Sequence, residues 1–335
     1  MQNATVIFKD CRKVELVTFP IPQPKEGELL LKSEKTLISQ GTELAVLRKE
    51  AIDADSVWAK AFPYPYIPGY ANVGVVADVG KGVAKQWIGK RVFSDLGHMA
   101  WGVKKAEEVF LVPDDISNDQ MLISVFASIA LCGVRRSRLK LGETAVVYGL
   151  GLIGQLVSQF CYASGALPVF CMERLEERRN LLPHPQRYVM ASNMDEMLAC
   201  IQEYSNGRMC DVAFEATGSG KLIQRETTAL HPFGRLVIVS SPRTASEFHF
   251  HDFCNRYSYE IIGAHNLLHP PVETYENPWT VQREVELYLN CLRTGRIDVT
   301  GYVGYNASYQ EAPKVYQDLL DDKQKALGVA LCWDH

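Results

Sequence analysis

Six residues, Gly149 to Gly154, have the spacing GxGxxG that suits a turn around a diphosphate. The run Thr144–Tyr148, rich in β-branched residues, precedes the turn, and an apolar segment of helical periodicity follows it. In such a turn the first glycine allows a sharp bend, the second lets the backbone approach a pyrophosphate, and the third lets the helix pack against the strand. The helix N-terminus adds free N–H groups and a partial positive charge. The stretch is therefore predicted to bind a dinucleotide.

The first, second and third glycines of this motif are Gly149, Gly151 and Gly154, and Leu152 and Ile153 begin the predicted helix. Each of these five residues is a predicted contact of the dinucleotide. A lone GxGxxG is weak, but here the strand, the helix, a second strand and an acidic residue all follow in register.

The acid that follows the second strand, Leu167–Met172, is Glu173, nineteen residues after Gly154. At this distance a carboxylate grips the ribose hydroxyls, and it repels a 2′-phosphate by roughly 1 to 4 kcal/mol. Glu173 therefore predicts NAD as the cofactor. Arg174 follows directly and could clamp a 2′-phosphate if Glu173 turned away, so NADP stays open as the alternative.

Composition limits the kind of protein. A chain of 335 residues suggests two domains, and 47% apolar with 22% charged residues is ordinary for a globular protein. The net charge of −4 provides no basic face for nucleic acid or an anionic membrane. Nine scattered cysteines without a CxxC pair, and no signal peptide, predict reduced thiols in the cytoplasm. The longest uncharged apolar stretch, Met121–Val134, is too short to span a bilayer.

Two patterns divide the chain. Before residue 113 the sequence shows short strands and turns, which suggests a small barrel, with a helix over Leu44–Lys60. A long helix is predicted from Asn118 to about Leu139. Strand and helix patterns then alternate, which indicates a doubly wound parallel sheet. The chain closes with helices over Val281–Gly295 and Tyr309–Asp321 and a strand over Gly328–Trp333.

This order resembles the medium-chain dehydrogenase/reductase superfamily over nearly the whole chain. The motifs that carry the resemblance are Gly41-Thr42-Glu43, Pro68-Gly69-Tyr70, Gly89-Lys90-Arg91-Val92, Leu141-Gly142-Glu143, the glycine turn, Glu215-Ala216-Thr217-Gly218 and Phe233-Gly234-Arg235. Within it, ISQGTEL and IPGYANVG are similar to bacteriochlorophyllide hydroxyethyl and sugar or cyclitol dehydrogenases. The resemblance implies an α/β protein with a GroES-like β-barrel catalytic domain (1–118), a Rossmann domain (119–264) and a return to the catalytic domain (265–335).

The resemblance also implies where zinc would be bound, and the residues there do not suit zinc. The family's cysteine, histidine and glutamate positions hold Gln40, Tyr70 and Ala71, and no cysteine lies in the segment 94–112 that would form a structural zinc lobe. We therefore expect a metal-free protein. A zinc site through His265 and His269 is the weaker alternative.

Without a Lewis acid, a side chain must manage the proton that accompanies hydride transfer. The candidates are Thr42, which matches the start of the family's proton relay, Tyr70, which takes a metal-ligand position, His98 in a loop near the substrate, and Glu43. Asp95 is a further candidate, and His265 is a lower-ranked one. The relay histidine is replaced by Ala45. Each has a plainer interpretation: Tyr70 as a packed aromatic, His98 as a surface histidine, and Glu43 as a structural carboxylate of the Gln40–Thr42 turn, which we favour.

The remaining cofactor contacts follow from the resemblance. Thr217 and Gly218 are expected under the pyrophosphate and the nicotinamide ribose, with Ser240 beyond the next strand. The aromatic residues Trp58, Phe62, Tyr64, Tyr66 and Trp101 could stack on a flat substrate, or they could form a small core of their own.

Three hypotheses of function remain. The leading one is a zinc-independent alcohol dehydrogenase or carbonyl reductase acting on a small-molecule polyol, sugar or cyclitol. The second is a reductase of C=C bonds in quinones or enones, and the third is a catalytically silent nucleotide-binding sensor. The resemblance also implies a homodimer joined along the strand Tyr259–Gly263.

Overall fold

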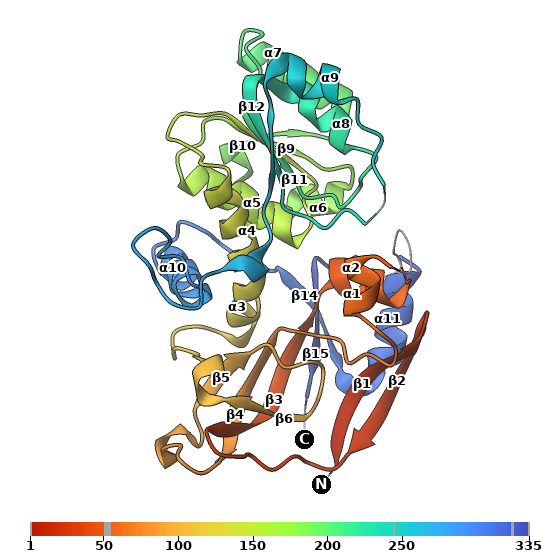
Figure 1. Ribbon diagram of the computed structural model, residues 1–335, viewed down its shortest axis with the longest axis vertical. Helices are drawn as coiled ribbons and strands as arrows, with labels where there is room; N and C mark the ends of the chain where they lie inside the picture. Colours follow the sequence, from red (N-terminus) through yellow and green to blue (C-terminus); the bar gives the residue numbers. More distant parts are fainter. Residues whose placement is uncertain (1, 50–54, 244, 323–324, 334–335) are drawn as a thin grey trace. The chain divides into compact units, whose positions relative to one another are not determined.

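The computed structural model describes residues 2–49, 55–243, 245–322 and 325–333. The chain divides into two compact units, one of Met1–Ile123 with Gly301–His335 and the other of Ser124–Thr300. The first holds a mixed sheet and the second a parallel sheet, each with its own hydrophobic core (Figure 1). The expected fold class, a GroES-like barrel domain with a Rossmann domain, is confirmed.

The second unit is built on a six-stranded parallel sheet of order β10-β9-β8-β11-β12-β13. The strands are β8 (Ala145–Tyr148), β9 (Val169–Met172), β10 (Tyr188–Ala191), β11 (Cys210–Glu215), β12 (Leu230–Ile238) and β13 (Glu260–Gly263). The order reverses between β8 and β11, and ligands of such sheets bind outside the carboxyl ends of the strands at this point. Strands β8, β9 and β11 are buried throughout, because helices cover both faces of the sheet.

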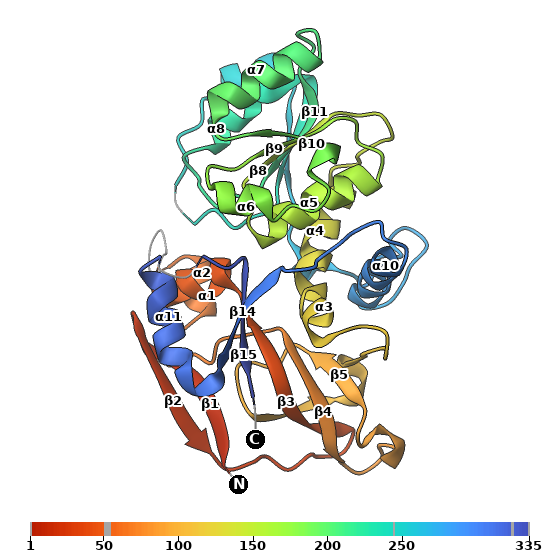
Figure 2. The ribbon, with the colours of Figure 1, turned by 180° about the vertical axis from the view of Figure 1, so that it is seen from behind.

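Helices lie on both sides of this parallel sheet, with α4 and α5 on one side and α7 and α8 on the other (Figures 1 and 2). The helices of the unit are α4 (Ser124–Arg136), α5 (Leu152–Ala163), α6 (Glu176–Asn180), α7 (Met194–Tyr204), α8 (Ile223–Glu226), α9 (Phe250–Phe253) and α10 (Val281–Arg293). Short 3-10 turns lie at Pro185–Arg187, Thr227–Ala229, Asn255–Tyr257 and Asn266–Leu268. Helix α5 begins directly at the glycine turn, so the turn is fixed to the sheet through β8 and to the helix layer through α5.

The first unit is built on a seven-stranded mixed sheet of order β14-β15-β3-β4-β5-β7, with β6 paired to β3, and a separate hairpin of β1 and β2. The strands are β1 (Asn3–Asp10), β2 (Lys13–Phe19), β3 (Glu28–Ile38), β4 (Asn72–Val79), β5 (Arg91–Ser94), β6 (Trp101–Lys105), β7 (Phe110–Leu111), β14 (Val303–Ser308) and β15 (Gly328–Cys332). Strand β15 pairs with β3, so the C-terminal segment completes the sheet that the N-terminal segment begins.

The helices of this unit are α1 (Gln40–Leu47), α2 (Val57–Ala61), α3 (Asn118–Leu122) and α11 (Ala312–Leu320), with 3-10 turns at Lys85–Trp87, Ala106–Glu108 and Tyr309–Glu311. Helix α11 contacts α1, β2 and β14, as seen in Figure 2. Phe8, Tyr316 and Trp333 are central to the core they share. This core holds α1 in place, and α1 carries two of the predicted catalytic residues, Thr42 and Glu43.

Several elements differ from expectation. Residues 50–54 of the helix expected over Leu44–Lys60 lie outside the described residues, and the described part forms α1 and α2. The long helix from Asn118 is two helices that meet at Ile123. Strand β6 was not predicted, because its sequence WGVKK has too little alternation to signal a strand.

The boundaries of the units lie at 123/124 and 300/301, whereas the sequence placed them at 118/119 and 264/265. The second difference has a clear cause in the contacts of α10. Its buried Glu284 accepts hydrogen bonds from Ser128 and Arg135 of α4, so this segment belongs to the parallel-sheet unit. Among the described residues, no helix is long and apolar enough to cross a membrane.

Candidate active site

The glycine turn has the geometry that its sequence predicts. Gly149 follows β8 with φ of 87°, a backbone conformation that side chains disfavour. A Cβ added to Gly154 would lie 1.7 Å from the carbonyl oxygen of Gly149, so only glycine permits this approach of helix to turn. A Cβ on Gly151 would meet no atom within 4 Å, so the space beside this residue is open. Leu152 and Ile153 form the first turn of α5.

We expect two alanine substitutions to separate folding from binding in this turn. Gly154→Ala should lower the free energy of unfolding by about 1–3 kcal/mol, because the new methyl group overlaps a backbone carbonyl. Gly151→Ala should leave the thermal midpoint unchanged but weaken NADH binding about tenfold, since its methyl occupies open space where a pyrophosphate approaches. Calorimetric unfolding and NADH titration of both variants provide the test. Unchanged NADH affinity in Gly151→Ala would contradict this assignment.

A second loop lies beside the glycine turn at the reversal of strand order. A Cβ on Gly149 would lie 3.1 Å from Cγ2 of Thr217, which places the loop after β11 against the turn after β8. The fully buried Glu215 organises this loop. Its Oε1 accepts hydrogen bonds from the Thr217 N–H (2.7 Å), the Thr217 hydroxyl (2.6 Å) and the Gly218 N–H (2.8 Å). Its Oε2 accepts one from the Ser240 hydroxyl. One carboxylate thus brings Thr217, Gly218 and Ser240 together.

Glu226 of α8 is a second buried carboxyl group close to Glu215. It is fully buried, and neither of its carboxyl oxygens has a hydrogen-bond partner among the described residues. Burial, with the charge of Glu215 adding to it, raises the pKa of Glu226 from its ordinary value of 4.5 to about 9. Glu226 is therefore a neutral acid at physiological pH.

Glu173, the acidic residue predicted to bind the ribose hydroxyls, also lies at the carboxyl end of a parallel strand, directly after β9. Glu173 is almost fully buried, and its carboxylate accepts hydrogen bonds from the N–H groups of Leu150 (3.0 Å) and Leu175 (3.0 Å). Arg178 approaches the same carboxylate at 3.7 Å. The Arg174 side chain is exposed and has no polar partner among the described residues. The Glu173 carboxylate is thus held in place by backbone N–H groups, with the exposed Arg174 side chain next to it in the sequence.

In the barrel unit, the predicted catalytic residues gather around the N-terminal turn of α1. The Tyr70 hydroxyl lies 2.5 Å from Oγ of Ser39 and also forms a hydrogen bond with the Thr42 side chain. Burial raises the pKa of Tyr70, the charge of Glu43 adds to this, and the hydrogen bonds from Ser39 and Thr42 only partly offset it. Tyr70 is consequently a neutral phenol at physiological pH, suited to donate a proton and not to accept one.

Glu43 is buried below this group and does not face solvent. Its Oε1 accepts a hydrogen bond from the Ser39 N–H (2.8 Å), and its Oε2 accepts from Tyr316 and from Nε2 of His98 (3.1 Å). With three donors on one carboxylate, Glu43 holds the start of α1 against the core. This geometry agrees with the structural alternative for Glu43 and not with proton exchange at a substrate.

The environment of His98 corrects its prediction as a proton carrier near the substrate. The imidazole is fully buried, with Nδ1 2.7 Å from the Thr36 hydroxyl and Nε2 facing Glu43. Since Nε2 faces a carboxylate, it carries a proton, and Thr36 donates to Nδ1 while accepting from Nε1 of Trp333 (2.9 Å). Both ring nitrogens are occupied inside the core, so His98 supports Glu43 instead of meeting a substrate.

The zinc that the fold family implies finds no suitable ligands at this place. The side-chain amide of Gln40 donates to the carbonyls of Ala326 (2.9 Å) and Leu327 (3.1 Å), and Tyr70 is engaged by Ser39. Across the described residues, no three His, Cys, Asp or Glu side chains are arranged to hold a metal ion, and this includes His265 and His269. The described residues at this position therefore do not fit a catalytic zinc.

The remaining candidates and the aromatic group have other contacts. Asp95 is exposed and pairs with Lys104 at 2.5 Å. The aromatic rings pack on one another and on the barrel core: Trp58 lies 4.7 Å from Phe62, and Phe62 lies 5.3 Å from Tyr66, centroid to centroid. These contacts agree with the interpretation of a small core.

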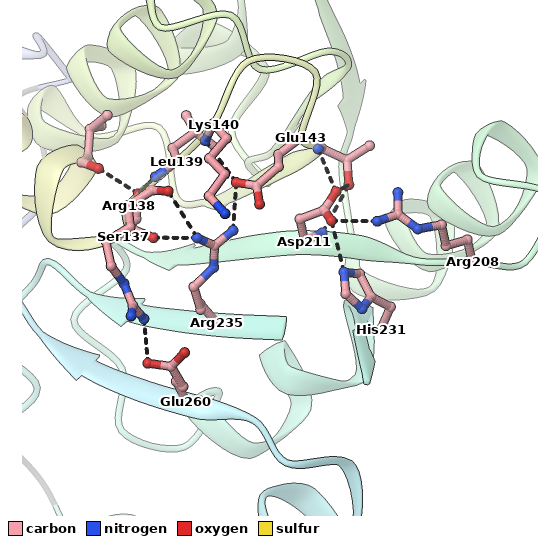
Figure 3. Close-up of polar contacts among 12 residues, drawn as sticks. Ser137, Arg138, Leu139, Lys140, Glu143, Arg208, Asp211, His231, Arg235 and Glu260 are labelled. Atoms are coloured by element: carbon pink, nitrogen blue, oxygen red, sulfur yellow. Dashed lines mark hydrogen bonds and ion pairs between the residues drawn. The ribbon is translucent and has the colours of Figure 1, made fainter. Parts of the chain in front are cut away.

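A pocket of about 260 Å³ lies near the amino ends of the parallel strands, whereas the glycine turn lies at their carboxyl ends. Lining side chains pair with one another, as Figure 3 shows: Arg235 with Glu143 (2.6 Å), Arg138 with Glu260, and Asp211 with His231 (2.8 Å). Arg235 also donates to the carbonyl of Ser137 (2.8 Å). These pairs fasten the loop before β8 to β12 and β13, so the pocket is a structural feature distant from the glycine turn.

Two residues important to the site were missed. Ser39 lies just before the motif Gly41-Thr42-Glu43. Because the helix was expected to begin only at Leu44, nothing in the predicted pattern marked Ser39 as the residue before α1. Glu226 had no signal, because its burial depends on how α8 packs under β11.

A fold with a doubly wound sheet, a glycine turn at its reversal point and a barrel unit completed by the C-terminal segment defines a class of two-domain nucleotide-binding proteins. A sequence model of the zinc-binding dehydrogenase family matches residues 153–271. The (R,R)-butanediol dehydrogenase of Bacillus subtilis is 31% identical over 216 residues, which cover 56% of this chain and 62% of that protein. The chain therefore matches somewhat less than two thirds of this relative's length.

Two further proteins extend the comparison. The 2-dehydro-3-deoxy-L-galactonate 5-dehydrogenase of Pseudoalteromonas atlantica is 25% identical over 71% of this chain and 74% of its own. A dehydrogenase structure from Sinorhizobium meliloti, bound to NADP, superposes with a TM-score of 0.79 and 18% identity over 99% of both chains. The family model thus matches one segment of the chain, and the likeness to the solved structure shows a shared fold over nearly the whole chain.

Proposed function

We propose that this protein is a zinc-independent alcohol dehydrogenase or carbonyl reductase that uses NAD(H) on a secondary alcohol or ketone of a polyol, sugar or cyclitol. The observation that carries the proposal is the Tyr70 phenol, which forms hydrogen bonds with the Ser39 and Thr42 hydroxyls at the position where the family resemblance implies a zinc ligand. The names of the relatives support the substrate class, since they act on a diol and on a sugar-derived acid.

In this proposal the bound nicotinamide supplies or takes the hydride. The Tyr70 hydroxyl donates its proton to the substrate oxygen as a carbonyl is reduced, and Thr42 and Ser39 stabilise the charge that remains on the phenol oxygen. In alcohol oxidation the same groups work in reverse. Glu43 and His98 do not contact the substrate in this proposal, and they support the site by holding the first turn of α1.

The choice of NAD(H) rests on Glu173. A 2′-phosphate beside this buried carboxylate would be repelled by roughly 1 kcal/mol in water-like surroundings and by more at a protein surface. The exposed Arg174 is the group that could reverse the preference, and the NADP bound to the Sinorhizobium relative keeps NADP(H) as the alternative.

The experiment is a screen of NAD⁺ and NADP⁺ reduction with polyols, sugars, cyclitols and simple alcohols, with the product identified. We expect a ketone formed from a secondary alcohol, and faster with NAD⁺. A saturated bond formed from an enone or quinone would instead support a C=C reductase. Tight NADH binding without turnover of any substrate would support a silent sensor.

Assembly and location complete the proposal. We place the dimer contact along β13, which is the edge of the parallel sheet and has Ile261 40% exposed. The mass in solution tests this, and a monomer would contradict it. All nine cysteines are free thiols, in keeping with a reducing cytoplasm.

A further inference from the structure

We propose that Glu215 is a positioning residue for the nicotinamide half of the dinucleotide, because its buried carboxyl group holds the loops that follow β11 and β12. The inference rests on the proposed function, in which a nicotinamide cofactor lies at the carboxyl ends of these strands. Glu215 is fully buried and does not touch the cofactor. It acts through the residues of the two loops that it holds.

The strand order assigns these two loops to one half of the cofactor. A dinucleotide lies across the reversal between β8 and β11, with its pyrophosphate at the glycine turn after β8. Glu173, the residue predicted to bind the ribose of the adenosine half, follows β9 on one side of the reversal. Strands β11 and β12 lie on the other side, so the loops after them are left for the nicotinamide half.

Gly218 shows that the loop after β11 leaves room for a ligand. Its φ is 77°, and a Cβ added to it would meet no atom within 4 Å. Gly151, in the loop after β8, has the same open space beside it. Open backbone therefore lies on both sides of the reversal, at the carboxyl ends of the strands that a dinucleotide would bridge.

Glu215 is bonded at both carboxyl oxygens by groups of these loops. Its Oε1 accepts from Thr217 and Gly218 of the loop after β11, and its Oε2 accepts from Ser240 after β12. The Thr217 hydroxyl also accepts a hydrogen bond from the Ser219 N–H (3.0 Å), which directs its proton at Glu215. The backbone carbonyl of Glu215 accepts from the Ser240 N–H (3.1 Å). One residue thus joins the two loops.

The side chain of Glu215 orders the loops and is not needed for the strand. Strand β11 pairs with β8 and β12 through its backbone. Thr217 is exposed, so without Glu215 its polar groups would bond to water and the loop would take other conformations. With Glu215 present, the loop is ordered before the cofactor binds, and such preorganisation increases affinity.

The test compares the two halves of the cofactor in Glu215→Met, which keeps the length of the side chain and removes both oxygens. NADH should bind about tenfold more weakly, because ordering the loops then becomes part of the binding free energy. AMP has no nicotinamide and should bind within about twofold of wild type. Isothermal titration calorimetry measures both affinities.

Glu215→Gln separates hydrogen bonding from the shape of the side chain. Its amide oxygen can accept from Thr217 and Gly218, and its amide N–H can donate to the Ser240 oxygen. NADH affinity should therefore return to within about threefold of wild type. The fluorescence anisotropy of bound NADH reports how firmly the nicotinamide is held. It should fall in Glu215→Met and recover in Glu215→Gln.

Glu284→Gln is the matched control, because it alters another buried glutamate of the same unit, one that joins α10 to α4 through Ser128 and Arg135. It should lower the thermal midpoint and leave both affinities unchanged. If Glu215→Met does not fold, Ser240→Ala takes its place, since it removes only the donor to Oε2, and NADH should then bind about threefold more weakly.

The outcomes separate the inference from the proposed function. Unchanged NADH affinity in a folded Glu215→Met, or in Ser240→Ala where it takes that place, would overturn the inference alone. An equal loss of NADH and AMP affinity would also overturn it, because Glu215 would then support the whole sheet and not one half of the cofactor. A wild-type protein that binds neither NADH nor NADPH would overturn the proposed function itself.

Discussion

Replacing Tyr70 with Phe should lower kcat for carbonyl reduction by about 100-fold or more, the usual contribution of a positioned acid. The substitution removes one oxygen atom and keeps the ring. The phenol is the group that Ser39 and Thr42 hold at the start of α1, and burial keeps it neutral. NADH binding should not change, because the glycine turn belongs to the other unit. Steady-state rates and NADH titration together provide the measurement.

The pH dependence of the wild-type protein has a definite sign. Reduction needs the protonated phenol, and the pKa of Tyr70 is raised, so the rate should stay high through neutral pH and fall only as pH rises through that raised value. Tyr66→Phe is the matched control, since it removes the hydroxyl of a second tyrosine and keeps the ring that packs against Phe8 and Phe62. Equal activity of the two variants would remove Tyr70 from the mechanism.

Replacing Glu226 with Gln should raise the free energy of unfolding by about 3 kcal/mol at pH 7. The pKa of Glu226 is raised to about 9 in the folded protein, whereas in the unfolded chain it is near its ordinary 4.5. The folded state therefore binds more protons between these values, and stability falls as pH rises from 4.5 toward 9. Gln has nearly the same shape and does not ionise.

The expected signature is a difference between the variant and wild type that grows with pH. It should be small at pH 5 and increase by about 1.4 kcal/mol for each pH unit above that. Urea unfolding at several pH values measures it. Glu203→Gln, at an exposed position of α7, is the control and should show no such trend. A constant difference at all pH values would show that Glu226 is ionised in the folded protein.

The parallel-sheet unit could be predicted well from sequence because its signals are local. Buried parallel strands such as β8 and β9 appear in the sequence as apolar runs. The glycines of the turn are required by backbone geometry, which their spacing in the sequence indicates. The last predicted boundary differs from that of the compact unit because the unit depends on a contact between Glu284 and Ser128, which no local sequence pattern indicates.

The barrel site shows the limit more clearly. The presence of Thr42, Glu43 and Tyr70 near one another was expected from motifs, but the burial of His98 was not. That burial requires Thr36 from β3 and Glu43 from α1, residues far apart in the sequence, to close around one imidazole. The motifs therefore identified the candidate side chains, but which of them is exposed to solvent depends on tertiary packing.

The central claim is that side chains, and no bound metal, manage the proton during hydride transfer. The most direct measurement is the rate of NAD⁺ reduction with the best alcohol of the screen, together with the zinc content of the same sample before and after chelation. Our account predicts full activity at a zinc content far below one ion per chain, unchanged by chelator. Activity that disappears with chelation and returns in proportion to added zinc would contradict it.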